Sequence, residues 1–454
     1  MFSSDDTIVA VATPAGYGGL GVVRLSGPSS GGIGQVMASR TQPWPVRRVV
    51  RCRLETALAP VDALVTYFAG PSSYTGEDVV EISTVGNPVL LGAVVERAVD
   101  LGARAARRGE FTLRAVLRGK MDLAQAEGLQ DLVEAVSPAQ VRAASDALDG
   151  TLSGEISRLA EELRSLEARV EASLDFPDEG YRFVEPGDVR AVLSRVVAEL
   201  DRLLGPGERA SLVRDGVRVV FAGAPNVGKS SLFNAIVGRA RAIVAAEPGT
   251  TRDVLTEPVV VSGLLMVLTD TAGVRDASDP VEEEGVRRAL SAVGDADVLV
   301  VVLDGSRDMG PAEARFLGEV RRPRVVVAVN KCDLPLSPGV LAVDPDVAES
   351  AVRVSARTGE GVDDLVARIA ACAGGVPGRE HVLVTRERQR GLLRSAREHL
   401  ARAVGHIERL GGGAPEELLA ADVRAAIGSL ADVVGLRTSD DLLEDIFSRF
   451  CIGK

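Results

Sequence analysis

Hydrophobic and polar positions over the first 118 residues alternate in short runs that glycine-rich turns separate. The runs "TIVAVAT", "GLGVVRL", "ALVTYF" and "DVVEIS" have the length and the β-branched content of strands. A helical pattern follows at about 87–103 and ends near Gly102. We therefore expect residues 1–118 to form a compact α+β domain.

From residue 119 to about 212 the apolar positions recur instead with the period of a helix. One stripe with steps of three and four predicts a single long helix, and its members are Leu152, Ile156, Leu159, Leu163, Leu166, Val170 and Leu174. Such a stripe is most often the core of a helical bundle. The segments "FPDEG" and "EPGD" are expected to be loops.

Residues 213–376 alternate strand patterns with helix patterns. The apolar runs "VRVVFAG", "LLMVLTD", "DVLVVVLD" and "RVVVAVN" are typical of buried strands, so we expect a parallel sheet with helices on both faces. After "GGVPG" the pattern returns to helix over about 384–448, interrupted around "GGGAPEE". We expect residues 377–454 to pack with 119–212 into one discontinuous helical domain, with the α/β module inserted between them.

The composition is that of a globular protein with two or three domains, since 46% of the 454 residues are hydrophobic and 26% are charged. The four cysteines lie far apart without a CxxC pair, which argues against a zinc site or a disulfide framework and for a reducing compartment. The sequence shows no signal peptide and no apolar run of about 18 residues. We therefore expect a cytoplasmic protein without membrane contact.

The net charge of −12 offers no general attraction for nucleic acid, and an aromatic content of 3% leaves few rings for base stacking. The three histidines are His381, His399 and His406, so all of them lie in the last 75 residues. Catalysis or metal binding that depends on histidine therefore has little support in the first 380 residues.

The segment "GAPNVGKS" (Gly223–Ser230) follows a strand pattern and precedes the helix-like "SLFNAIVG", so it matches GxxxxGK[ST] in the context that this motif requires. Backbone NH groups of such a loop cradle phosphates, Lys229 reaches the terminal phosphates, and Ser230 can bind magnesium. The segment therefore predicts a site for a nucleoside triphosphate.

Three later segments add magnesium binding and recognition of guanine. "DTAG" (Asp270–Gly273) offers a carboxylate for magnesium and a glycine NH for the terminal phosphate. In "NKCD" (Asn330–Asp333), Asp333 can accept hydrogen bonds from the ring NH and the amino group of guanine, a pair that adenine cannot offer. "SAR" (Ser355–Arg357) can donate a backbone NH to the guanine oxygen. The four elements in this order predict a GTPase rather than a degenerate module without nucleotide.

"GTTRD" (Gly249–Asp253) is the expected switch loop, with Thr251 as the second magnesium ligand. Val274 follows "DTAG" where Ras-like proteins carry a water-orienting Gln, so hydrolysis needs another polar group. The cluster "DPVEEEG" offers three candidates, which are Glu282, Glu283 and Glu284. The alternative role, which suits the last two best, is a solvated acidic helix start.

Almost every positive charge is an arginine: 48 Arg stand against four Lys, which are Lys120, Lys229, Lys331 and Lys454. Lys and Arg exchange readily on exposed surfaces, but not where a compact ammonium is needed. Because two of the four belong to the nucleotide motifs, we expect Lys120 and Lys454 to lie in sites as well. The alternative for Lys454 is a frayed terminus.

With these motifs and several longer stretches, the chain resembles the bacterial tRNA-modification GTPase family MnmE (TrmE) over essentially its full length. The stretches are "DTIVAVATPAGYGGLGVVRLSG", "SYTGEDVVEI", "RRGEFTLRAVLRGKMDLAQAEGLQDLV", "GAPNVGKSSLFN", "GTTRD", "DTAGVR" and "FCIGK". The last of them is highly specific.

The resemblance implies an N-terminal domain akin to tetrahydrofolate-dependent aminomethyltransferases, a helical domain made of two chain segments, and an inserted P-loop GTPase domain. It also implies a homodimer formed through the N-terminal domains. With the flavoprotein partner MnmG (GidA), members of the family add an aminomethyl or carboxymethylaminomethyl group to carbon 5 of the wobble uridine in certain tRNAs.

The resemblance also assigns residues outside the GTPase motifs. A glutamate can hold the NH groups of a pterin while cations suit its carboxylate tail, and the residues implied for 5-formyltetrahydrofolate or a related folate are Arg24, Glu81, Lys120 and Lys454. Cys451 matches a terminal cysteine implicated in the modification step. Glu282 matches the water-orienting glutamate of the family, which singles out one member of the acidic cluster.

The implied GTP site runs from the P-loop through the switch loop to the base-reading segments. Its residues are Asn226, Val227, Gly228, Lys229, Ser230, Ser231, Ala245, Ala246, Glu247, Pro248, Gly249, Thr250, Thr251, Asp270, Thr271, Ala272, Gly273, Asn330, Lys331, Asp333, Ser355, Ala356 and Arg357. Magnesium is implied at Ser230 and Thr251. Potassium would take the place of an arginine finger, with ligands from Asn226, Ala245, Glu247 and Thr250.

Two positions depart from the family pattern. Val85-Gly86-Asn87 stands where His-Gly-Gly is common after the folate glutamate, and Arg108 stands where Pro is usual in "RRGEFT". Both departures concern the N-terminal domain, so neither affects the GTPase prediction.

Two other functions compete with this one. A ribosome-assembly GTPase resembling Era or EngA would be favoured by a KH-like domain or a second GTPase module, and the sequence shows neither. A folate-dependent aminomethyltransferase with a regulatory G domain would leave the terminal "CIGK" unexplained.

Overall fold

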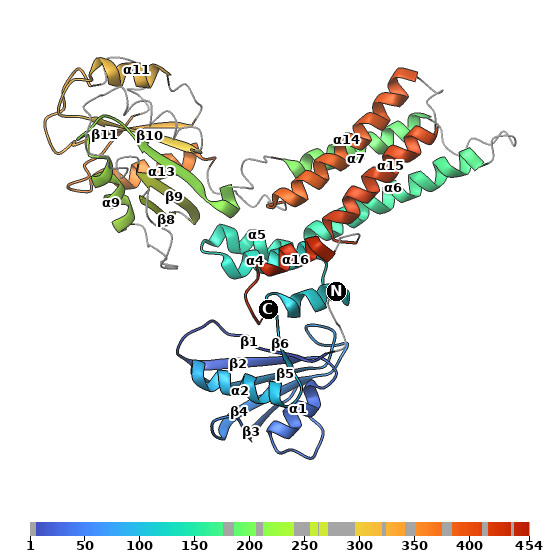
Figure 1. Cartoon of the computed structure of the whole chain (residues 1–454). Coiled ribbons are helices and arrows are strands. Elements are labelled where there is room, and N and C mark those ends of the chain that lie inside the picture. Colours follow the sequence, from blue (N-terminus) through green and yellow to red (C-terminus); the bar gives the residue numbers. More distant parts are fainter. Residues whose placement is uncertain are drawn as a thin grey trace. The chain divides into compact units, whose positions relative to one another are not determined.

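The structure is a computed structural model, which describes residues 6–175, 186–205, 212–239, 255–261, 263–270, 296–319, 324–340, 351–374, 384–410, 416–436 and 440–453 (Figure 1). The chain forms two compact units. The first comprises Met1–Gln130, Leu148–Val197 and Leu392–Lys454, and the second comprises Asp131–Ala147 and Ala198–Gly391. The predicted combination of an α+β domain, helices from two chain segments and an α/β module is confirmed.

The first unit contains a six-stranded sheet with the order β3-β4-β5-β2-β1-β6. Its strands are β1 (Ile8–Val11), β2 (Gly18–Ser26), β3 (Val49–Leu54), β4 (Val61–Phe68), β5 (Val79–Gly86) and β6 (Arg104–Ala105). Neighbours are antiparallel except β1 and β6, which are parallel. The four predicted strands are confirmed. Strands β3 and β6 were not predicted, because β3 carries arginines at alternate positions and β6 has only two residues.

Helices α1 (Ser30–Met37) and α2 (Pro88–Asp100) contribute to the core on one face of this sheet. That core buries Val9, Leu25 and Ile82, which come from three neighbouring strands. Because side chains alternate along a strand, the residues between these positions point to the opposite face.

The opposite face of the sheet meets helix α3 (Glu110–Leu117), whose Phe111 packs in an apolar cluster with Ile8 of β1. Arg24 of β2 and Glu81 of β5 belong to this second face, since they alternate with buried core residues. The sheet therefore presents two charged side chains next to an aromatic helix residue.

Further helices contribute to the first unit: α4 (Leu123–Glu134), α6 (Thr151–Asp175), α7 (Pro186–Leu204), α14 (Glu387–Leu410), α15 (Glu416–Val433) and α16 (Asp440–Ser448). The predicted stripe on α6 is confirmed, because its members from Leu152 to Val170 are at most 4% exposed. The side chain of Leu174 lies outside the described part of the chain. Helix α15 packs along α6, and Arg424 pairs with Glu167 at 2.9 Å.

The C-terminal helical pattern contains one break that was not predicted. Helix α15 ends at Val433 and α16 begins at Asp440, with Gly435 in the left-handed region at φ +86°. A glycine takes this conformation without steric cost, and such a residue commonly ends a helix.

The second unit contains a six-stranded sheet with the order β12-β11-β10-β7-β9-β8. Its strands are β7 (Val217–Ala222), β8 (Leu255–Val261), β9 (Leu264–Asp270), β10 (Val298–Asp304), β11 (Val325–Asn330) and β12 (Val352–Arg353). All neighbours are parallel except β8, which runs antiparallel to β9 at the edge. The four predicted strands, β7, β9, β10 and β11, are thus confirmed as a parallel sheet, whereas the edge strands β8 and β12 were not predicted.

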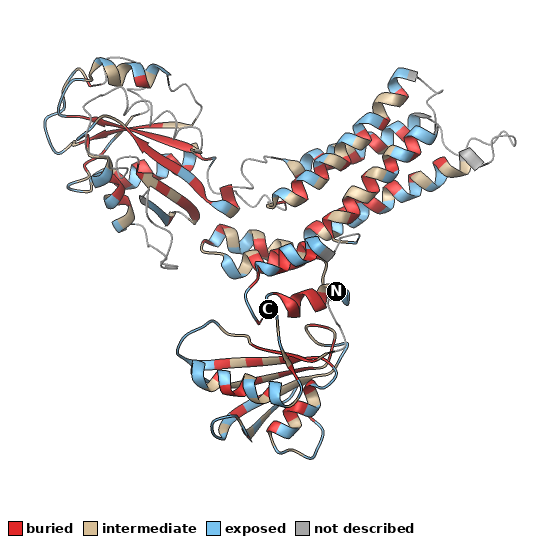
Figure 2. Cartoon of the chain, in the orientation of Figure 1, coloured by how far each residue is buried: buried red, intermediate tan, exposed pale blue. Residues whose placement is uncertain are grey.

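Both faces of the second sheet are covered, as predicted. Helices α9 (Lys229–Arg239) and α13 (Val362–Cys372) share one core with the sheet, and α11 (Pro311–Glu319) shares the other. Strands β7, β10 and β11 are consequently buried along most of their length (Figure 2). Helix α5 (Pro138–Leu148) also meets this unit, because the Ala139 NH donates to the Gly263 carbonyl at 3.3 Å.

Candidate functional site

The loop between β7 and α9 has the backbone geometry of a phosphate-binding loop. Gly223 and Gly228 have φ of +149° and +97°, and Asn226 has φ of +63°. A Cβ atom on Gly228 would lie 2.3 Å from Asn330 Nδ2, and one on Gly223 would lie 2.3 Å from the Val302 carbonyl oxygen. Only glycine therefore fits at these two positions.

Lys229 begins helix α9, and its Nζ donates to the carbonyl oxygens of Gly223 and Ala224, both at 2.9 Å. Burial lowers the pKa of the Lys229 ammonium, and the charge of Asp270 partly offsets this. The ammonium is thus held by neutral oxygens of the loop itself. A phosphate oxygen is a stronger acceptor because it is charged, and would replace these contacts.

Asp270 ends β9 and is 1% exposed. It pairs in register with Phe221, next to the end of β7 from which the phosphate loop starts. Because the carboxyl ends of parallel strands meet at one edge of a sheet, Asp270 and the phosphate loop lie at the same edge. Ser230, the second residue of α9, follows Lys229 there.

The base-reading segments are brought to the same edge by Asn330, which is 2% exposed at the end of β11. Its Nδ2 donates to the Val227 carbonyl at 2.8 Å, and its Oδ1 accepts from the Ala356 NH at 3.0 Å. Ser355 Oγ donates to Asp333 Oδ1 at 2.7 Å, which orients that carboxylate. The structure therefore joins "NKCD" to both the phosphate loop and "SAR".

Asp304 is a member of this region that the sequence prediction missed. It ends β10, and its Oδ2 accepts from Lys331 Nζ at 2.6 Å. Burial would raise the pKa of Asp304, but hydrogen bonds from Lys331 and Ser306 outweigh burial and hold it below its ordinary value. The signal was present, because "DVLVVVLD" ends with an acidic residue at the carboxyl edge of the sheet. Asp304 fixes the side chain of Lys331, whose backbone has φ +66°.

Several predicted GTP and ion residues lie outside the described part of the chain: Ala245, Ala246, Glu247, Pro248, Gly249, Thr250, Thr251, Thr271, Ala272, Gly273 and Glu282. Their roles stay predictions.

A second candidate site lies on the first sheet, where Arg24 and Glu81 pair across β2 and β5. Arg24 Nη2 lies 2.8 Å from Glu81 Oε1, and the two side chains are 20% and 29% exposed. The Arg24 guanidinium also lies 5.1 Å from the ring centre of Tyr74 and 5.8 Å from that of Phe111. Tyr74 in turn shares a hydrogen bond of 2.8 Å with Thr112 Oγ1 on α3.

Tyr74 and Phe111 were missed by the sequence prediction, although both stand in quoted stretches, "SYTGEDVVEI" and "RRGEFTLR". Their rarity was the usable signal, because only 3% of the residues are aromatic. The half-buried Tyr74 ring beside an arginine provides a flat apolar surface together with a cation, which suits a planar polar ring system, whereas Phe111 is fully buried beneath Arg24.

Lys120 lies beside the loop that carries Tyr74, whose ring packs against Arg24. A Cβ atom on Gly76 would be 3.4 Å from Lys120 Cγ and 3.3 Å from two atoms of Arg118. Since Gly76 is two residues after Tyr74, the structure brings Lys120 to the same loop, where its side chain is exposed. Three of the four predicted folate residues thus lie around one strand pair and its adjoining loop.

The C-terminal tail reaches the same domain. The Gly109 NH donates to the Cys451 carbonyl at 3.4 Å, and Arg108 forms an antiparallel bridge with Ile452. A Cβ atom on Gly453 would lie 2.1 Å from the Val11 carbonyl oxygen, so the tail runs directly against the end of β1. Lys454 itself lies outside the described residues.

The departure at Val85-Gly86-Asn87 has a structural account. Asn87 caps helix α2, since its Oδ1 accepts from the Val89 NH at 2.9 Å and from the Leu90 NH at 3.2 Å. An asparagine at this position satisfies NH groups that a glycine could not. The segment after β5 therefore leads directly into a capped N-terminus of helix α2.

Among the described residues, no helix combines the length and the apolar composition that crossing a membrane requires. Among the same residues, no group of three or more His, Cys, Asp or Glu side chains is placed to hold a metal ion.

Comparison with known proteins gives matches along the whole chain. A family model described as "MnmE helical domain" matches residues 123–451, and another, described as "GTP-binding protein TrmE N-terminus", matches residues 7–120. The tRNA modification GTPase MnmE of Stutzerimonas stutzeri (strain A1501) is 42% identical over 460 residues, with 100% of both chains covered. That of Acinetobacter baylyi (strain ATCC 33305 / BD413 / ADP1) is 40% identical over 452 residues, covering 99% of this chain and 96% of the relative.

Proposed function

The chain belongs to the MnmE family of tRNA modification GTPases, and from this premise we propose that it couples GTP hydrolysis to modification of the wobble uridine of certain tRNAs. The added group would be an aminomethyl or carboxymethylaminomethyl group at carbon 5, installed together with the flavoprotein MnmG (GidA). The cytoplasm is the proposed location. The full-length match favours this function over a ribosome-assembly GTPase.

The observation that carries the proposal is the oriented Asp333 carboxylate, held by Ser355 and joined through Asn330 to the phosphate loop. A carboxylate accepts two hydrogen bonds from guanine, whereas adenine offers no such pair of donors. Replacing Asp333 by Asn turns one acceptor into a donor. The change should therefore weaken GTP binding and improve binding of xanthosine triphosphate, which carries an oxygen where guanine has its amino group.

The first experiment tests the whole function. The full-length chain is expressed in bacteria deleted for their own homologue, and modified wobble uridine is quantified in digested bulk tRNA. Restored modification by the native chain, and its absence with Asp333→Asn, supports coupling to GTP. Absence of modification with the native chain, although it hydrolyses GTP, would remove the proposed tRNA role and leave the GTPase.

Two cations are part of the proposal. Magnesium would be held by Ser230 and Thr251, where its positive charge would stabilise the negative charge of the phosphates during hydrolysis. Potassium would bind the Asn226 side chain together with carbonyl oxygens of the loop Ala245–Thr250. Asn226 supports this role because its side chain is exposed on the phosphate loop, next to where the terminal phosphates would lie. Glu282 is proposed to orient the attacking water.

A folate is the proposed ligand of the second site, as 5-formyltetrahydrofolate or a close relative. Glu81 can accept from the amino and ring NH groups of a pterin, and the half-buried Tyr74 supplies a flat surface beside it. Lys120, and Lys454 at the end of the tail, can pair with the carboxylates of the folate tail. Cys451 would lie near the one-carbon group, since its carbonyl contacts Gly109 at the start of α3.

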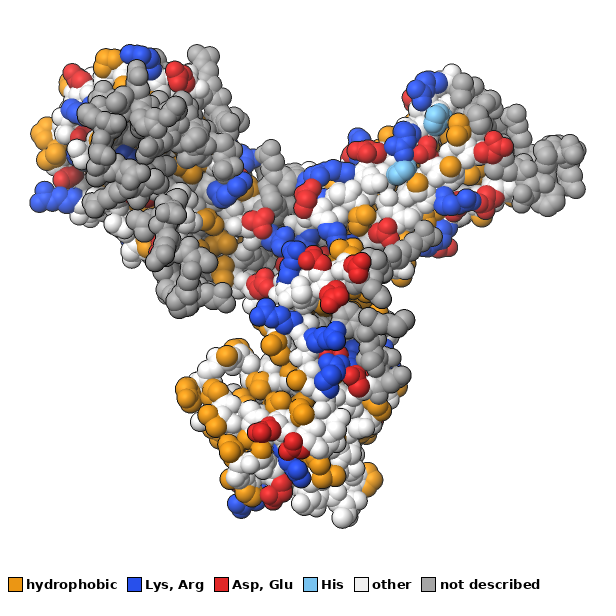
Figure 3. Space-filling view, viewed as in Figure 1, with side chains coloured by type: hydrophobic (Ala, Val, Ile, Leu, Met, Phe, Trp, Pro, Cys, Tyr) orange, Lys and Arg blue, Asp and Glu red, His pale blue; other side chains and the backbone are white. Residues whose placement is uncertain are grey.

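We assign the homodimer contact to an apolar patch on the first sheet. Its members are Tyr17, Leu20, Val85 and Val89, which are 84%, 62%, 58% and 64% exposed. They lie together because Gly18 pairs with Gly86, and a Cβ on Gly86 would be 2.8 Å from the Leu20 carbonyl oxygen. Figure 3 shows hydrophobic side chains gathered on this domain. Contiguous exposed apolar surface of this kind is typical of an interface.

The dimer assignment is tested by sedimentation of the full chain and of Leu20→Glu. If the native chain is a dimer and Leu20→Glu is a monomer that still hydrolyses GTP, the result supports the patch as the dimer contact. A native chain that sediments as a monomer at every concentration would eliminate the dimer.

A further inference from the structure

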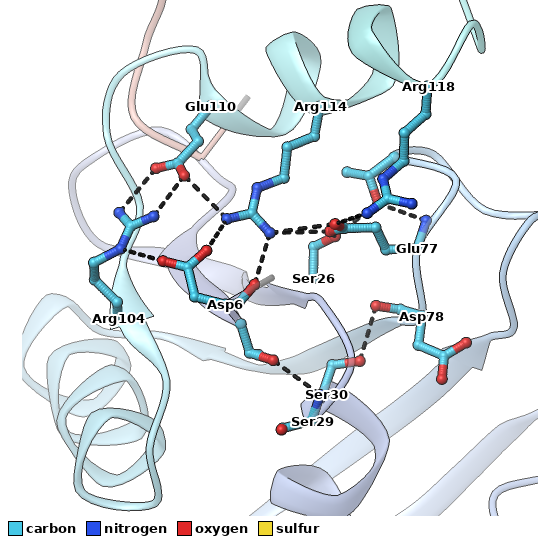
Figure 4. A network of polar contacts seen from close by, with 12 residues as sticks. Asp6, Ser26, Ser29, Ser30, Glu77, Asp78, Arg104, Glu110, Arg114 and Arg118 are labelled. Atoms are coloured by element: carbon cyan, nitrogen blue, oxygen red, sulfur yellow. Dashed lines mark hydrogen bonds and ion pairs between the residues drawn. The ribbon is translucent and has the colours of Figure 1, made fainter. Parts of the chain in front are cut away.

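A network of charged side chains is buried in the first unit next to the proposed folate site (Figure 4). Arg114, Glu110 and Glu77 are 3%, 2% and 6% exposed. Charged residues are almost never buried to this extent unless they are paired, and these three are paired with one another. None of them belongs to the set that binds the ligand.

Arg114 of α3 connects three separate pieces of chain. Its Nη1 donates to the Asp6 carbonyl at 2.8 Å and to Glu77 Oε2 at 3.1 Å. Its Nη2 donates to Glu110 Oε1 at 3.1 Å and to the Asp6 carboxylate. One planar guanidinium thus fixes the segment before β1, the loop before β5 and the first residue of α3 in a single arrangement.

The Glu77 branch leads to Tyr74. Glu77 Oε2 also accepts from Ser26 Oγ at 2.7 Å, and Ser26 Oγ lies 2.6 Å from Thr75 Oγ1. Thr75 follows Tyr74 directly, and Ser26 is two residues after Arg24 on the same face of β2. The network therefore sets the position of the Tyr74 ring relative to the Arg24 guanidinium.

The Glu110 branch leads to the tail. Glu110 accepts from both Nη atoms of Arg104, at 2.7 and 3.1 Å, and from the Arg107 NH at 2.8 Å. These bonds shape the turn that ends at Gly109, which has φ of +64° and donates its NH to Cys451. The position of Cys451 thus depends on the same buried carboxylate.

A contribution to stability does not by itself explain why these charged residues are buried. Moving charged groups from water into a protein core costs free energy, and well-packed apolar residues of similar volume often stabilise as well or better. What the charges provide is geometry, because a guanidinium forms directional bonds with several acceptors at once. An apolar core would leave the loop and the turn free to shift against each other.

We propose that Arg114 and Glu77 are positioning residues, which hold Tyr74 beside Arg24 and hold the tail at the start of α3, so that both ends of the site face one ligand. The proposal rests on the proposed folate function for its ligand. It makes no use of a contact between either residue and the ligand itself.

The test compares full-length variants that separate geometry from stability. The double variant Arg114→Met/Glu77→Met removes both central charges together. In this variant the buried Glu110 carboxylate still pairs with Arg104. Arg118 loses its contact with Glu77, but its side chain is 40% exposed and can be hydrated. A second variant, Arg114→Lys, keeps the charge but lacks the planar fork. The control is Arg424→Met, which breaks an exposed ion pair elsewhere in the first unit.

Three quantities are measured on each variant: the melting temperature, the Kd for 5-formyltetrahydrofolate, and hydrogen exchange of peptides that contain Gly109 and the tail. We expect the double variant to fold, to bind the folate at least about tenfold more weakly, and to exchange faster at Gly109. Arg114→Lys should show the same two losses. Arg424→Met should show neither.

The proposal is overturned if the folded double variant keeps folate affinity and Gly109 exchange within about twofold of the native chain. If the double variant does not fold, Arg114→Lys decides by the same criteria. If the native chain binds no folate, the folate function fails by itself, while exchange at Gly109 still tests whether Arg114 and Glu77 position the tail.

Discussion

Asn330 donates its side-chain NH to the Val227 carbonyl at 2.8 Å, which ties the guanine-reading segment to the phosphate loop. Its Oδ1 accepts from the Ala356 NH, so a single buried amide connects three loops. Base recognition and phosphate recognition are therefore coupled through one side chain.

Replacing Asn330 by Ala should both weaken GTP binding and lower the free energy of unfolding of the second unit. The change leaves the Val227 carbonyl and the Ala356 NH without this partner, at a cost of about 1–3 kcal/mol each where they are buried. We expect the Kd for GTP to rise at least about tenfold, measured with a fluorescent GTP analogue. Arg315→Ala on α11 is the control. An unchanged Kd would show that the coupling is not needed for binding.

Hydrolysis should be faster in potassium chloride than in sodium chloride at saturating GTP. A potassium ion at Asn226 would neutralise charge that develops between the phosphates, and the smaller sodium ion fits the same oxygen ligands less well. The measurement is phosphate release at constant ionic strength. Asn226→Ala should reduce the difference between the two salts. Equal native rates in both salts would contradict the potassium assignment.

Acid should destabilise the first unit through Glu110 and Asp6. Burial would raise the pKa of both carboxyls, but hydrogen bonds from Arg104 and Arg114 outweigh burial and hold them below their ordinary values. A lowered native pKa stabilises the fold above the unfolded pKa of about 4, and this contribution is lost as the pH falls through the native pKa.

Calorimetry between about pH 2.5 and 7 checks this expectation. Glu110→Gln should melt lower than the native chain at pH 7, because it leaves buried Arg114 with less compensation. Its melting temperature should then fall less steeply than that of the native chain below about pH 4. The control is Glu161→Gln on α6, whose side chain is 77% exposed. Parallel curves for the native chain and Glu110→Gln would refute the role assigned to Glu110.

Cys451 should react first with alkylating reagents. It is the exposed member of the four cysteines, whereas Cys52, Cys332 and Cys372 are half-buried. Burial raises the pKa of each of those three thiols, which lowers their thiolate fraction.

Limiting iodoacetamide followed by peptide mass spectrometry provides the measurement. We expect labelling of Cys451 to be at least about tenfold faster than that of the other three thiols. Cys451→Ser should remove the fast phase without changing the slow ones. A fast phase that persists in this variant would place the reactive thiol elsewhere.

Gln140 joins helix α5 to the sheet of the second unit. Its Oε1 accepts from the Val136 and Ser137 NH groups at 2.9 and 3.0 Å, and its Nε2 donates to the Arg214 carbonyl at 2.7 Å, just before β7. Val136, Gln140 and Arg214 line a pocket of about 210 Å³ together with Leu265.

Gln140→Ala should lower the free energy of unfolding of the second unit by about 2 kcal/mol, since it removes a helix cap and leaves polar groups unpaired. Denaturant titration of the full chain, with and without GDP, measures the change. Val141→Ala on the exposed side of the same helix is the matched control. An effect no larger than that of the control would show that Gln140 does not join the two elements.

The local patterns of the sequence determined most of the second unit and much of its site. Phosphate binding depends on consecutive residues, because a glycine-rich turn and the helix that follows generate the cradle by themselves. The strands β7, β9, β10 and β11 were likewise predicted from continuous apolar runs. The edge strands β8 and β12 were not predicted, because β8 has only a short run of consecutive apolar residues and β12 has only two residues.

Only the tertiary structure decided what surrounds Arg24. Tyr74 and Phe111 come from a loop and a helix far along the chain, and the network that holds them joins Asp6, Glu77 and Arg114 across more than one hundred positions. No periodicity links such residues. Which of these residues contact one another depends on the sheet register and on the burial of α3, and both result from many packing contacts. The sequence by itself therefore determined the chemistry of these residues, but not which residues lie beside them.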